Sequence, residues 1–296
     1  MLSVGYIGLG IMGKPMAHNV LKAGFPLVVH NRSQAAVEEL CREGAIPAHS
    51  PEEVAKQVDV IFTNLPDSPN VEVVALGRNG IIEGGHEGLI YVDNSTIKPS
   101  VSRKIAQMMK SKDVACLDAP VSGGQIGAQE GTLSIMVGGP EKALKKILPI
   151  LNVIGKKITY VGGNGAGQIA KAANQIMVAA QMVALGELLI LSQKSGVDAK
   201  KVIEAIRGGA AQCWTLDHKP TRLFAGNRQP GFKAALQAKD LNIVIETARE
   251  YDVPLPMTAV NTQLFHSMIA MGMGELDNSA VISVIEHLAS TQLNTN

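Results

Sequence analysis

The chain has 296 residues, enough to bury a core without disulfides or a structural metal. Its 27 basic and 26 acidic residues leave a net charge of +1, which argues against nucleic acid or an anionic membrane surface as a partner. Aromatic residues are only 3%, too few for a base-stacking platform. The 46% of hydrophobic residues, against 18% charged, exclude a disordered chain.

Cysteine and histidine usage gives no sign of a metal or a disulfide framework. Cys41, Cys116 and Cys213 are odd in number and far apart, and the seven histidines lack paired ligand spacing. The N-terminus has no basic signal-peptide region, and the most apolar stretch, 176–192, contains an amide and a carboxylate. We therefore expect no metal, no membrane span and a cytoplasmic protein, with an organelle matrix as the alternative for a processed chain.

Short apolar runs alternate with helical patterns through the first half. The expected strands are 2–7, 26–29, 58–62, 88–92, 114–117, 133–137 and 158–161. The expected helices are 12–23, 34–42, 51–57, 69–76 and 99–109, with a further helix after Pro140. This alternation predicts an α/β domain whose doubly wound, mostly parallel sheet is covered by helices on both faces.

The pattern changes at residues 162–167, where four glycines in six residues indicate a flexible joint or a helix entry. The segment 168–194 is apolar on most sides, so we expect a long, deeply buried helix. Further helices are expected at 199–206, 215–224, 234–251, 257–270 and 279–289. The expected domains are a dinucleotide-binding domain, 1–163, and an all-helical substrate and oligomerisation domain, 164–296.

The segment from Gly8 to Gly13 has G-x-G-x-x-G spacing between an expected strand and an expected helix, the context that dinucleotide binding needs. Gly8 would permit the tight turn, Gly10 the approach of backbone to a pyrophosphate, and Gly13 the packing of helix on strand. Ile11 and Met12 lie where the helix N-terminus faces the phosphates. The alternative is an ordinary glycine-rich turn.

The residues after the second expected strand bear on the cofactor. No acid lies between Leu27 and Val37 to bind an unphosphorylated ribose. Asn31 can hydrogen-bond a ribose or phosphate oxygen, and Arg32 can pair with a 2′-phosphate. This favours NADP(H), with NAD(H) possible; alternatively, Arg32 is a solvated side chain beside a helix start.

Four blocks occur in an order typical of one protein family. They run from Gly5 to Gly13, from Asp118 to Gly124, from Gly165 to Asn174, and from Lys239 to Leu241. With them the chain resembles the β-hydroxyacid dehydrogenase family over essentially its whole length. The resemblance implies a Rossmann-type domain, then an all-helical domain entered by a long interdomain helix, and NAD(P)-dependent chemistry on a small carboxylate-bearing aldehyde or hydroxy acid.

Lys171 is the candidate proton donor. Apolar neighbours would desolvate it and lower its pKa toward neutrality, and by resemblance it matches the family's catalytic lysine. Asn174 lies three residues further on, on the same helix face, where its amide can hold the substrate hydroxyl or carbonyl. The alternative for Lys171 is a surface lysine near a helix start, and for Asn174 a helix-entry residue.

Ser122, Gly123 and Gly124 offer a hydroxyl and backbone N–H groups in a compact turn, an arrangement suited to a carboxylate. The resemblance assigns the substrate carboxylate to them, and the alternative is a plain turn. It also places Lys239 against cofactor and substrate, and Phe232 over the nicotinamide, although a solvated charge pair would explain Lys239 as well. Family positions along the cofactor are matched by Leu65, Pro66, Asn70 and Thr96.

Three stretches, 131–139, 173–175 and 205–209, favour the branch of the family that reduces tartronate semialdehyde to D-glycerate. Enzymes for 3-hydroxyisobutyrate typically have a second Asn in place of Gln175. That activity, succinic semialdehyde or glyoxylate reduction, and a non-catalytic dinucleotide sensor are the alternatives. Retention of Lys171 beside an intact Ser122 turn argues against the sensor. The long apolar helix further predicts a homodimer or homotetramer.

Overall fold

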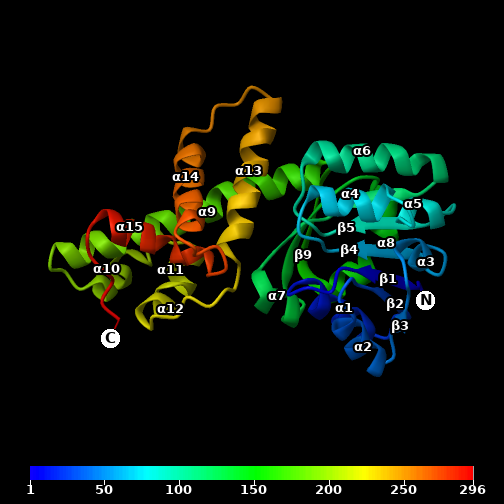
Figure 1. Ribbon diagram of the computed structural model, residues 1–296, viewed down its shortest axis with the longest axis horizontal. Coiled ribbons are helices and arrows are strands. Elements are labelled where there is room, and N and C mark those ends of the chain that lie inside the picture. Colours follow the sequence, from blue (N-terminus) through cyan, green and yellow to red (C-terminus); the bar gives the residue numbers. More distant parts are fainter. Residues whose placement is uncertain (296) are drawn as a thin grey trace. The chain divides into compact units, whose positions relative to one another are not determined.

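A computed structural model describes residues 1–295, which form two compact units (Figure 1). The first unit is Met1–Lys171, and the second begins at Ala172. The division between them falls within a helix that begins at Ala166, whereas the predicted domain boundary is at residue 163. The roles assigned to the two domains stay a prediction.

The first unit contains one nine-stranded sheet, in the order β3-β2-β1-β4-β5-β6-β8-β7 with β9 paired to β8. The strands are β1 (Val4–Ile7), β2 (Leu27–His30), β3 (Ile46–Pro47), β4 (Val60–Thr63), β5 (Ile90–Asp93), β6 (Ala115–Asp118), β7 (Val121–Ser122), β8 (Leu133–Gly138) and β9 (Gly155–Gly162). All pairs are parallel except β6–β8 and β7–β8. The predicted doubly wound, mostly parallel sheet is confirmed.

Helices cover both faces of this sheet (Figure 1). One face packs against α1 (Gly13–Lys22), α2 (Gln34–Arg42), α7 (Gly124–Glu130) and α8 (Glu141–Ile154). The other packs against α3 (Pro51–Ala55), α4 (Ser68–Leu76), α5 (Ile81–Gly84) and α6 (Pro99–Met109), which continues into the 3₁₀ turn η1 (Lys110–Lys112). Neighbouring strand residues serve opposite cores: Tyr6 is buried under the first group and Ile7 under the second.

The second unit is helical, and residues 163–295 contain no strand. Helix α9 (Ala166–Lys194) enters it from the first unit. It is followed by α10 (Ala199–Ile206), α11 (Trp214–His218), α12 (Pro220–Phe224), α13 (Ala234–Glu250), α14 (Pro256–Ala270), η2 (Asn278–Val281) and α15 (Ile282–Leu288). The single helix predicted over 215–224 is wrong: it divides before Pro220, which has no N–H to continue the ladder.

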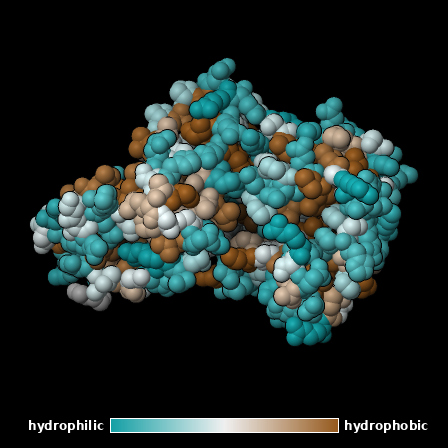
Figure 2. All heavy atoms as spheres, in the orientation of Figure 1, coloured by the Kyte–Doolittle hydropathy of each residue, from teal (hydrophilic) through white to brown (hydrophobic). Residues whose placement is uncertain are grey.

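Helix α9 is less buried than its composition predicts. Ala179 and Leu189 are fully buried, but Met177 is 59% and Leu191 72% exposed on the described chain. By length and composition α9 is the one described helix that could cross a membrane, and half of its most apolar window is buried. A core helix of a soluble protein meets the same test. Brown spheres in Figure 2 mark further apolar side chains on the outside of the helical unit.

A buried ion pair lies inside the second unit. Lys219 Nζ donates to Asp277 Oδ1 over 2.7 Å, and both side chains are almost fully enclosed. Burial lowers the pKa of Lys219, opposed by the nearby carboxylate. Burial raises the pKa of Asp277, but the Lys219 ammonium and the hydrogen bonds from Ser279 and Gly231 together outweigh it, and the net pKa lies below its ordinary value. Asp277 also accepts hydrogen bonds from the Gly231 amide and the Ser279 hydroxyl, so it joins three segments of this unit.

Replacing Lys219 by Met should destabilise the protein at pH 7, because the buried Asp277 carboxylate loses its hydrogen-bonded ammonium and keeps only the Arg222 guanidinium, 4.0 Å away. We expect the free energy of unfolding to fall by about 3–5 kcal/mol. Urea denaturation followed by circular dichroism measures it. The matched control is Lys201→Met on exposed α10, for which a change within about 0.5 kcal/mol is expected. A loss no larger than the control's would contradict the argument.

Candidate active site

The glycine loop joins β1 to α1. Gly8 has φ +95°, and an added Cβ would lie 2.3 Å from the Asn64 carbonyl oxygen. At Gly13 it would lie 1.9 Å from the Gly8 carbonyl oxygen, whereas at Gly10 it meets nothing within 4 Å. Two glycines are thus required by the turn itself, and Gly10 faces open space. No side chain caps the start of α1 and no acid lies in its first turn, so its N–H groups suit an anionic ligand such as a pyrophosphate.

Strand β1 lies where the sheet order reverses, between β2 and β4. In open parallel sheets, ligands bind outside the carboxyl ends of the strands at this switch point. The ends of β1, β2, β4 and β5 share one edge of the sheet, and that edge brings together the predicted cofactor residues Gly8 to Gly13, Asn31, Arg32, Leu65, Pro66 and Thr96. Asn70 lies in the first turn of α4.

Asn31 has a role in the protein that the sequence did not indicate. Its Oδ1 accepts the Leu9 N–H over 3.0 Å, and its Nδ2 donates to the Ser33 carbonyl over 2.9 Å. The side chain therefore holds the glycine loop against the end of β2, and its contact with a ribose stays a prediction. Arg32, next to it, is exposed.

The predicted carboxylate-binding turn is the junction of β7 and α7. Ser122 pairs with Ser134 in the sheet, so it ends a strand, which the sequence pattern did not predict. Gly123 and Gly124 follow with φ +138° and +64°, conformations that favour glycine. The chain thus reverses sharply directly after the Ser122 hydroxyl.

Lys171 is not a surface residue, because only 7% of it is exposed. Its Nζ donates to the Val121 carbonyl oxygen over 2.9 Å. Val121 directly precedes Ser122, so the first unit brings the candidate proton donor next to the candidate carboxylate-binding turn.

The Asp118 carboxylate caps the N-terminus of α9. Oδ1 accepts the Gly165 N–H over 2.7 Å and Oδ2 the Gln168 N–H over 3.0 Å. A Cβ on Gly138 or Gly167 would lie 2.7–2.8 Å from Oδ2, so these glycines make room for the carboxylate. Burial raises the pKa of Asp118, opposed by these backbone N–H groups. The glycine-rich segment 162–167 therefore leads into α9, and the Asp118 carboxylate lies at the N-terminus of that helix.

Gln168 binds the same helix start to the end of β5. Its Nε2 donates to the Ser95 carbonyl over 2.8 Å, and its Oε1 accepts the Ile97 N–H over 3.1 Å. The backbone that carries Lys171 one turn later is thus fixed to two strands of the sheet, β5 and β6.

In the second unit, Asn174 and Lys239 are connected through two residues that sequence reasoning did not place in the site. Asn174 Nδ2 donates to Gln175 Oε1, and Gln175 Nε2 donates to Asp240 Oδ2. Lys239 Nζ lies 2.8 Å from Asp240 Oδ1. Phe232 lies outside this chain of contacts, and its N–H donates to Asp277. Asp240 belongs to the family-typical segment 239–241, but its burial could not be inferred from the sequence.

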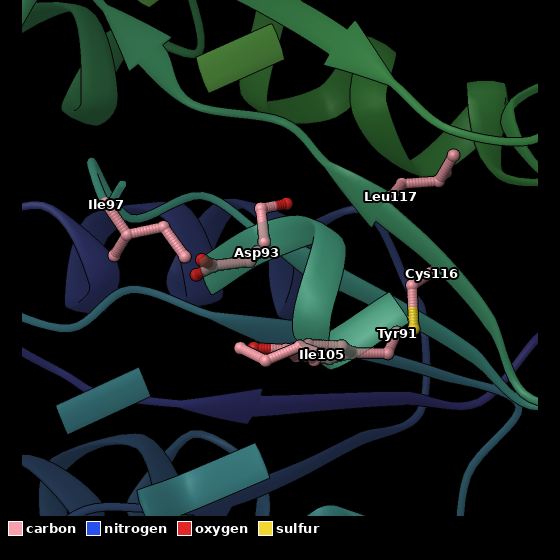
Figure 3. A pocket seen from close by; sticks show the side chains of 7 residues that line it. Tyr91, Asp93, Ile97, Ile105, Cys116 and Leu117 are labelled. Atoms are coloured by element: carbon pink, nitrogen blue, oxygen red, sulfur yellow. The ribbon is translucent and has the colours of Figure 1, made fainter. Parts of the chain in front are cut away.

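Asp93 is a second buried carboxylate at the sheet edge. It lines a cavity of about 10 Å³ with Tyr91 and Cys116 (Figure 3). Oδ1 accepts from the Thr63 hydroxyl and the Ser95 N–H, while Oδ2 has no hydrogen-bond partner among the described residues. Burial raises the pKa of Asp93 to about 6. Residues 1–295 contain no group of His, Cys, Asp and Glu able to hold a metal ion.

Comparison with known proteins agrees with this architecture. Residues 3–162 match the NAD binding domain of 6-phosphogluconate dehydrogenase, and residues 165–285 match the NAD-binding domain of NADP-dependent 3-hydroxyisobutyrate dehydrogenase. The chain belongs to the β-hydroxyacid dehydrogenase family. It is therefore an NAD(P)-dependent oxidoreductase, as the resemblance of its motifs implied.

Three relatives are similar over nearly the whole chain. The 2-hydroxy-3-oxopropionate reductase of Escherichia coli is 41% identical, covering 99% of this chain and 100% of the relative. The solved 3-hydroxyisobutyrate dehydrogenase of Mycobacterium tuberculosis with L-serine has a TM-score of 0.88 at 30% identity, covering 96% of this chain and 99% of the other. The structure of Psf3 with NADP+ and 2-OPP has a TM-score of 0.86 at 26% identity, covering 95% and 99%.

Asp93→Asn should change how stability depends on pH. The native pKa of about 6 exceeds the ordinary value of 3.8, so the folded state binds this proton more tightly than the unfolded state, and the contribution of Asp93 to stability falls as pH rises from about 4 to 6. Above pH 6, keeping the Asp93 carboxylate ionised in the folded protein lowers the free energy of unfolding by about 3 kcal/mol. The variant keeps an acceptor for Thr63 and Ser95 but lacks this titration.

Urea unfolding of both proteins at pH 4 and pH 7 measures the difference, because the other titrating groups are shared. The variant should gain about 3 kcal/mol relative to wild type between the two pH values. An identical pH dependence in the two proteins would show that Asp93 does not titrate in this range.

Proposed function

We propose that the protein is an NADPH-preferring reductase that converts tartronate semialdehyde to D-glycerate. The observation that carries the proposal is the buried Lys171 ammonium, bonded to the carbonyl of Val121 directly before the Ser122-Gly123-Gly124 turn. A proton donor next to a carboxylate-binding turn suits a substrate with a carboxylate and an aldehyde two bonds apart. The similarity to 2-hydroxy-3-oxopropionate reductase supports the same substrate.

The residues divide the reaction between them. The Ser122 hydroxyl and the N–H groups of Gly123 and Gly124 bind the substrate carboxylate. When bound, the nicotinamide supplies a hydride to the aldehyde carbon. Lys171 gives a proton to the aldehyde oxygen, which becomes the new hydroxyl, and the neutral amine regains its proton from solvent. Asn174, one helical turn from Lys171, orients the substrate oxygen.

The second candidate is 3-hydroxyisobutyrate dehydrogenase. It is favoured by the protein-family match of residues 165–285 and by the similarity to the solved M. tuberculosis enzyme. The two aldehydes differ at one position, where tartronate semialdehyde has a hydroxyl and methylmalonic semialdehyde a methyl group. A site that hydrogen-bonds a hydroxyl rejects the analogue without it far more strongly than an apolar pocket distinguishes one methyl group. The polar chain from Asn174 to Lys239 favours the hydroxyl.

The preference for NADP(H) rests on the end of β2. Arg32 is exposed there, and no acid from Leu27 to Val37 competes for a ribose hydroxyl or repels a 2′-phosphate. Asn31, whose amide oxygen already accepts a hydrogen bond from Leu9, leaves the guanidinium as the main group for that phosphate.

We also propose that the chain is a cytoplasmic homo-oligomer that associates through α9. Ala173, Met177, Ala184 and Leu191 recur at helical spacing and are all exposed on the described chain. Exposed apolar side chains at this spacing, interrupted on α9 by the exposed Glu187, are typical of a protein interface. A second copy of the chain fits it, as a dimer or a tetramer.

The first test follows cofactor absorbance with NADPH and NADH against tartronate, succinic and methylmalonic semialdehydes and glyoxylate. Turnover should be fastest with NADPH and tartronate semialdehyde. Lys171→Ala should lower kcat by roughly 100- to 10,000-fold, and Lys171→Arg should not restore it, because arginine keeps the charge but does not release a proton.

Each contrary outcome is informative. Substantial turnover by Lys171→Ala would assign the proton donor to another group. Preference for methylmalonic semialdehyde would select the 3-hydroxyisobutyrate activity instead. Cofactor binding without turnover of any aldehyde would support the non-catalytic sensor.

Arg32→Ala should weaken NADPH binding by roughly 10- to 100-fold, the value of a charge-assisted bond to phosphate, and leave NADH binding unchanged. Titration calorimetry of the free protein measures both dissociation constants. Arg42→Ala on α2 removes an equal charge away from the strand end and is the control. Equal loss of affinity for the two cofactors would contradict a 2′-phosphate contact.

A further inference from the structure

Four polar side chains of the second unit form one connected row. Asn174 Nδ2 donates to Gln175 Oε1 over 2.8 Å, and Gln175 Nε2 donates to Asp240 Oδ2 over 2.5 Å. Asp240 Oδ1 lies 2.8 Å from Lys239 Nζ. Gln175 and Asp240 are each only 2% exposed, so they sit between two residues assigned to substrate and cofactor without being open to solvent.

The row has a fixed polarity. Asp240 Oδ2 accepts the hydrogen bond from Gln175, and Oδ1 forms an ion pair with the Lys239 ammonium but accepts no hydrogen bond among the described residues. An ionised carboxylate has only acceptors to offer. Gln175 must therefore point its NH₂ group at Asp240 and its Oε1 at Asn174. Asn174 must in turn present Nδ2 to Gln175, so its own Oδ1 is directed elsewhere. One buried negative charge thus sets the direction of two amides in succession.

We propose that Gln175 and Asp240 are positioning residues that set the amide orientation of Asn174 and hold the Lys239 ammonium. The inference deepens the proposed function and rests on it. With this polarity Asn174 offers an acceptor, Oδ1, toward the substrate, which matches a hydroxyl that donates a hydrogen bond. The row therefore contributes to selecting a 2-hydroxy substrate over its methyl analogue.

Side-chain length is part of the argument. Asparagine at position 175 would be one methylene shorter and could not keep a 2.5 Å contact with Asp240 while also accepting from Asn174. A buried carboxylate without its donor is costly, so the row depends on glutamine here.

The test exchanges the two groups. Gln175→Glu places two carboxylates in contact, and Asp240→Asn lets the Gln175 amide rotate by half a turn. Each single change should therefore lower kcat with tartronate semialdehyde by roughly 100-fold, the effect of misplacing a group by about an ångström. The double variant Gln175→Glu/Asp240→Asn restores an N–H···O bond between the positions. It also keeps an oxygen toward Asn174 and the same net charge.

We expect the double variant to recover kcat to within roughly 10-fold of wild type, far above the product of the two single effects. The matched control is Gln237→Glu/Asp240→Asn. It makes the same exchange at a different buried glutamine, Gln237 of α13, whose partner is Asn278 rather than Asn174. It should not recover. Double-variant activity equal to the product of the singles would overturn the proposal.

Two further measurements, thermal unfolding and kcat per folded molecule, distinguish a positioning role from a structural one. Thermal unfolding of the proteins without cofactor should show the double variant melting above Gln175→Glu, which tests the exchanged bond without any activity. If kcat per folded molecule is unchanged in the single variants and only their melting temperature falls, the pair is structural and the proposal fails. If wild type turns over no semialdehyde, the proposed function fails, and with it the positioning role.

Discussion

The site in the first unit depends on one buried carboxylate, Asp118. It occupies the N-terminal end of α9, where the unpaired N–H groups of a helix and its dipole stabilise negative charge. The helix start is thereby held against the end of β6, and Gln168 binds it to the end of β5. Lys171 follows within one turn, so the direction of its ammonium toward the Val121 carbonyl is a consequence of that capping. Gly138 and Gly167 are small because the carboxylate fills the space that their side chains would need.

Much of the fold could be predicted because periodicity and end signals agree along most of the chain. The bounds of α2, α6 and α10 match the prediction, and proline in the first turn marks the start of α6. The missed elements are β3, β7, α5, α7 and the 3₁₀ turn η1, which are too short to show a period. Burial of α9 was overestimated because an apolar composition does not tell whether a helix packs within its own chain.

The candidate site could be predicted only in part, since sequence shows which residues have suitable chemistry but not which partners they have. Asn31 looked available for a ribose, yet its amide oxygen accepts the Leu9 N–H. Lys239 and Asp240 looked like a possible solvated pair, yet Asp240 is enclosed and bonded to Gln175, 65 residues away in sequence. Such a contact leaves no local pattern in the sequence, because an aspartate is written the same way whether the fold buries it or exposes it.

The two units use buried carboxylates in different ways. Asp118 accepts backbone N–H groups and so fixes where a helix begins, which decides the position of Lys171. Asp240 accepts from the Gln175 side chain and so sets the direction of that amide, which in turn sets the direction of the Asn174 amide. Position suffices for a proton donor, whose N–H groups rotate freely about the Cε–Nζ bond. An amide has distinct donor and acceptor ends, so it also needs a direction, and an acceptor-only group at the end of the row supplies it.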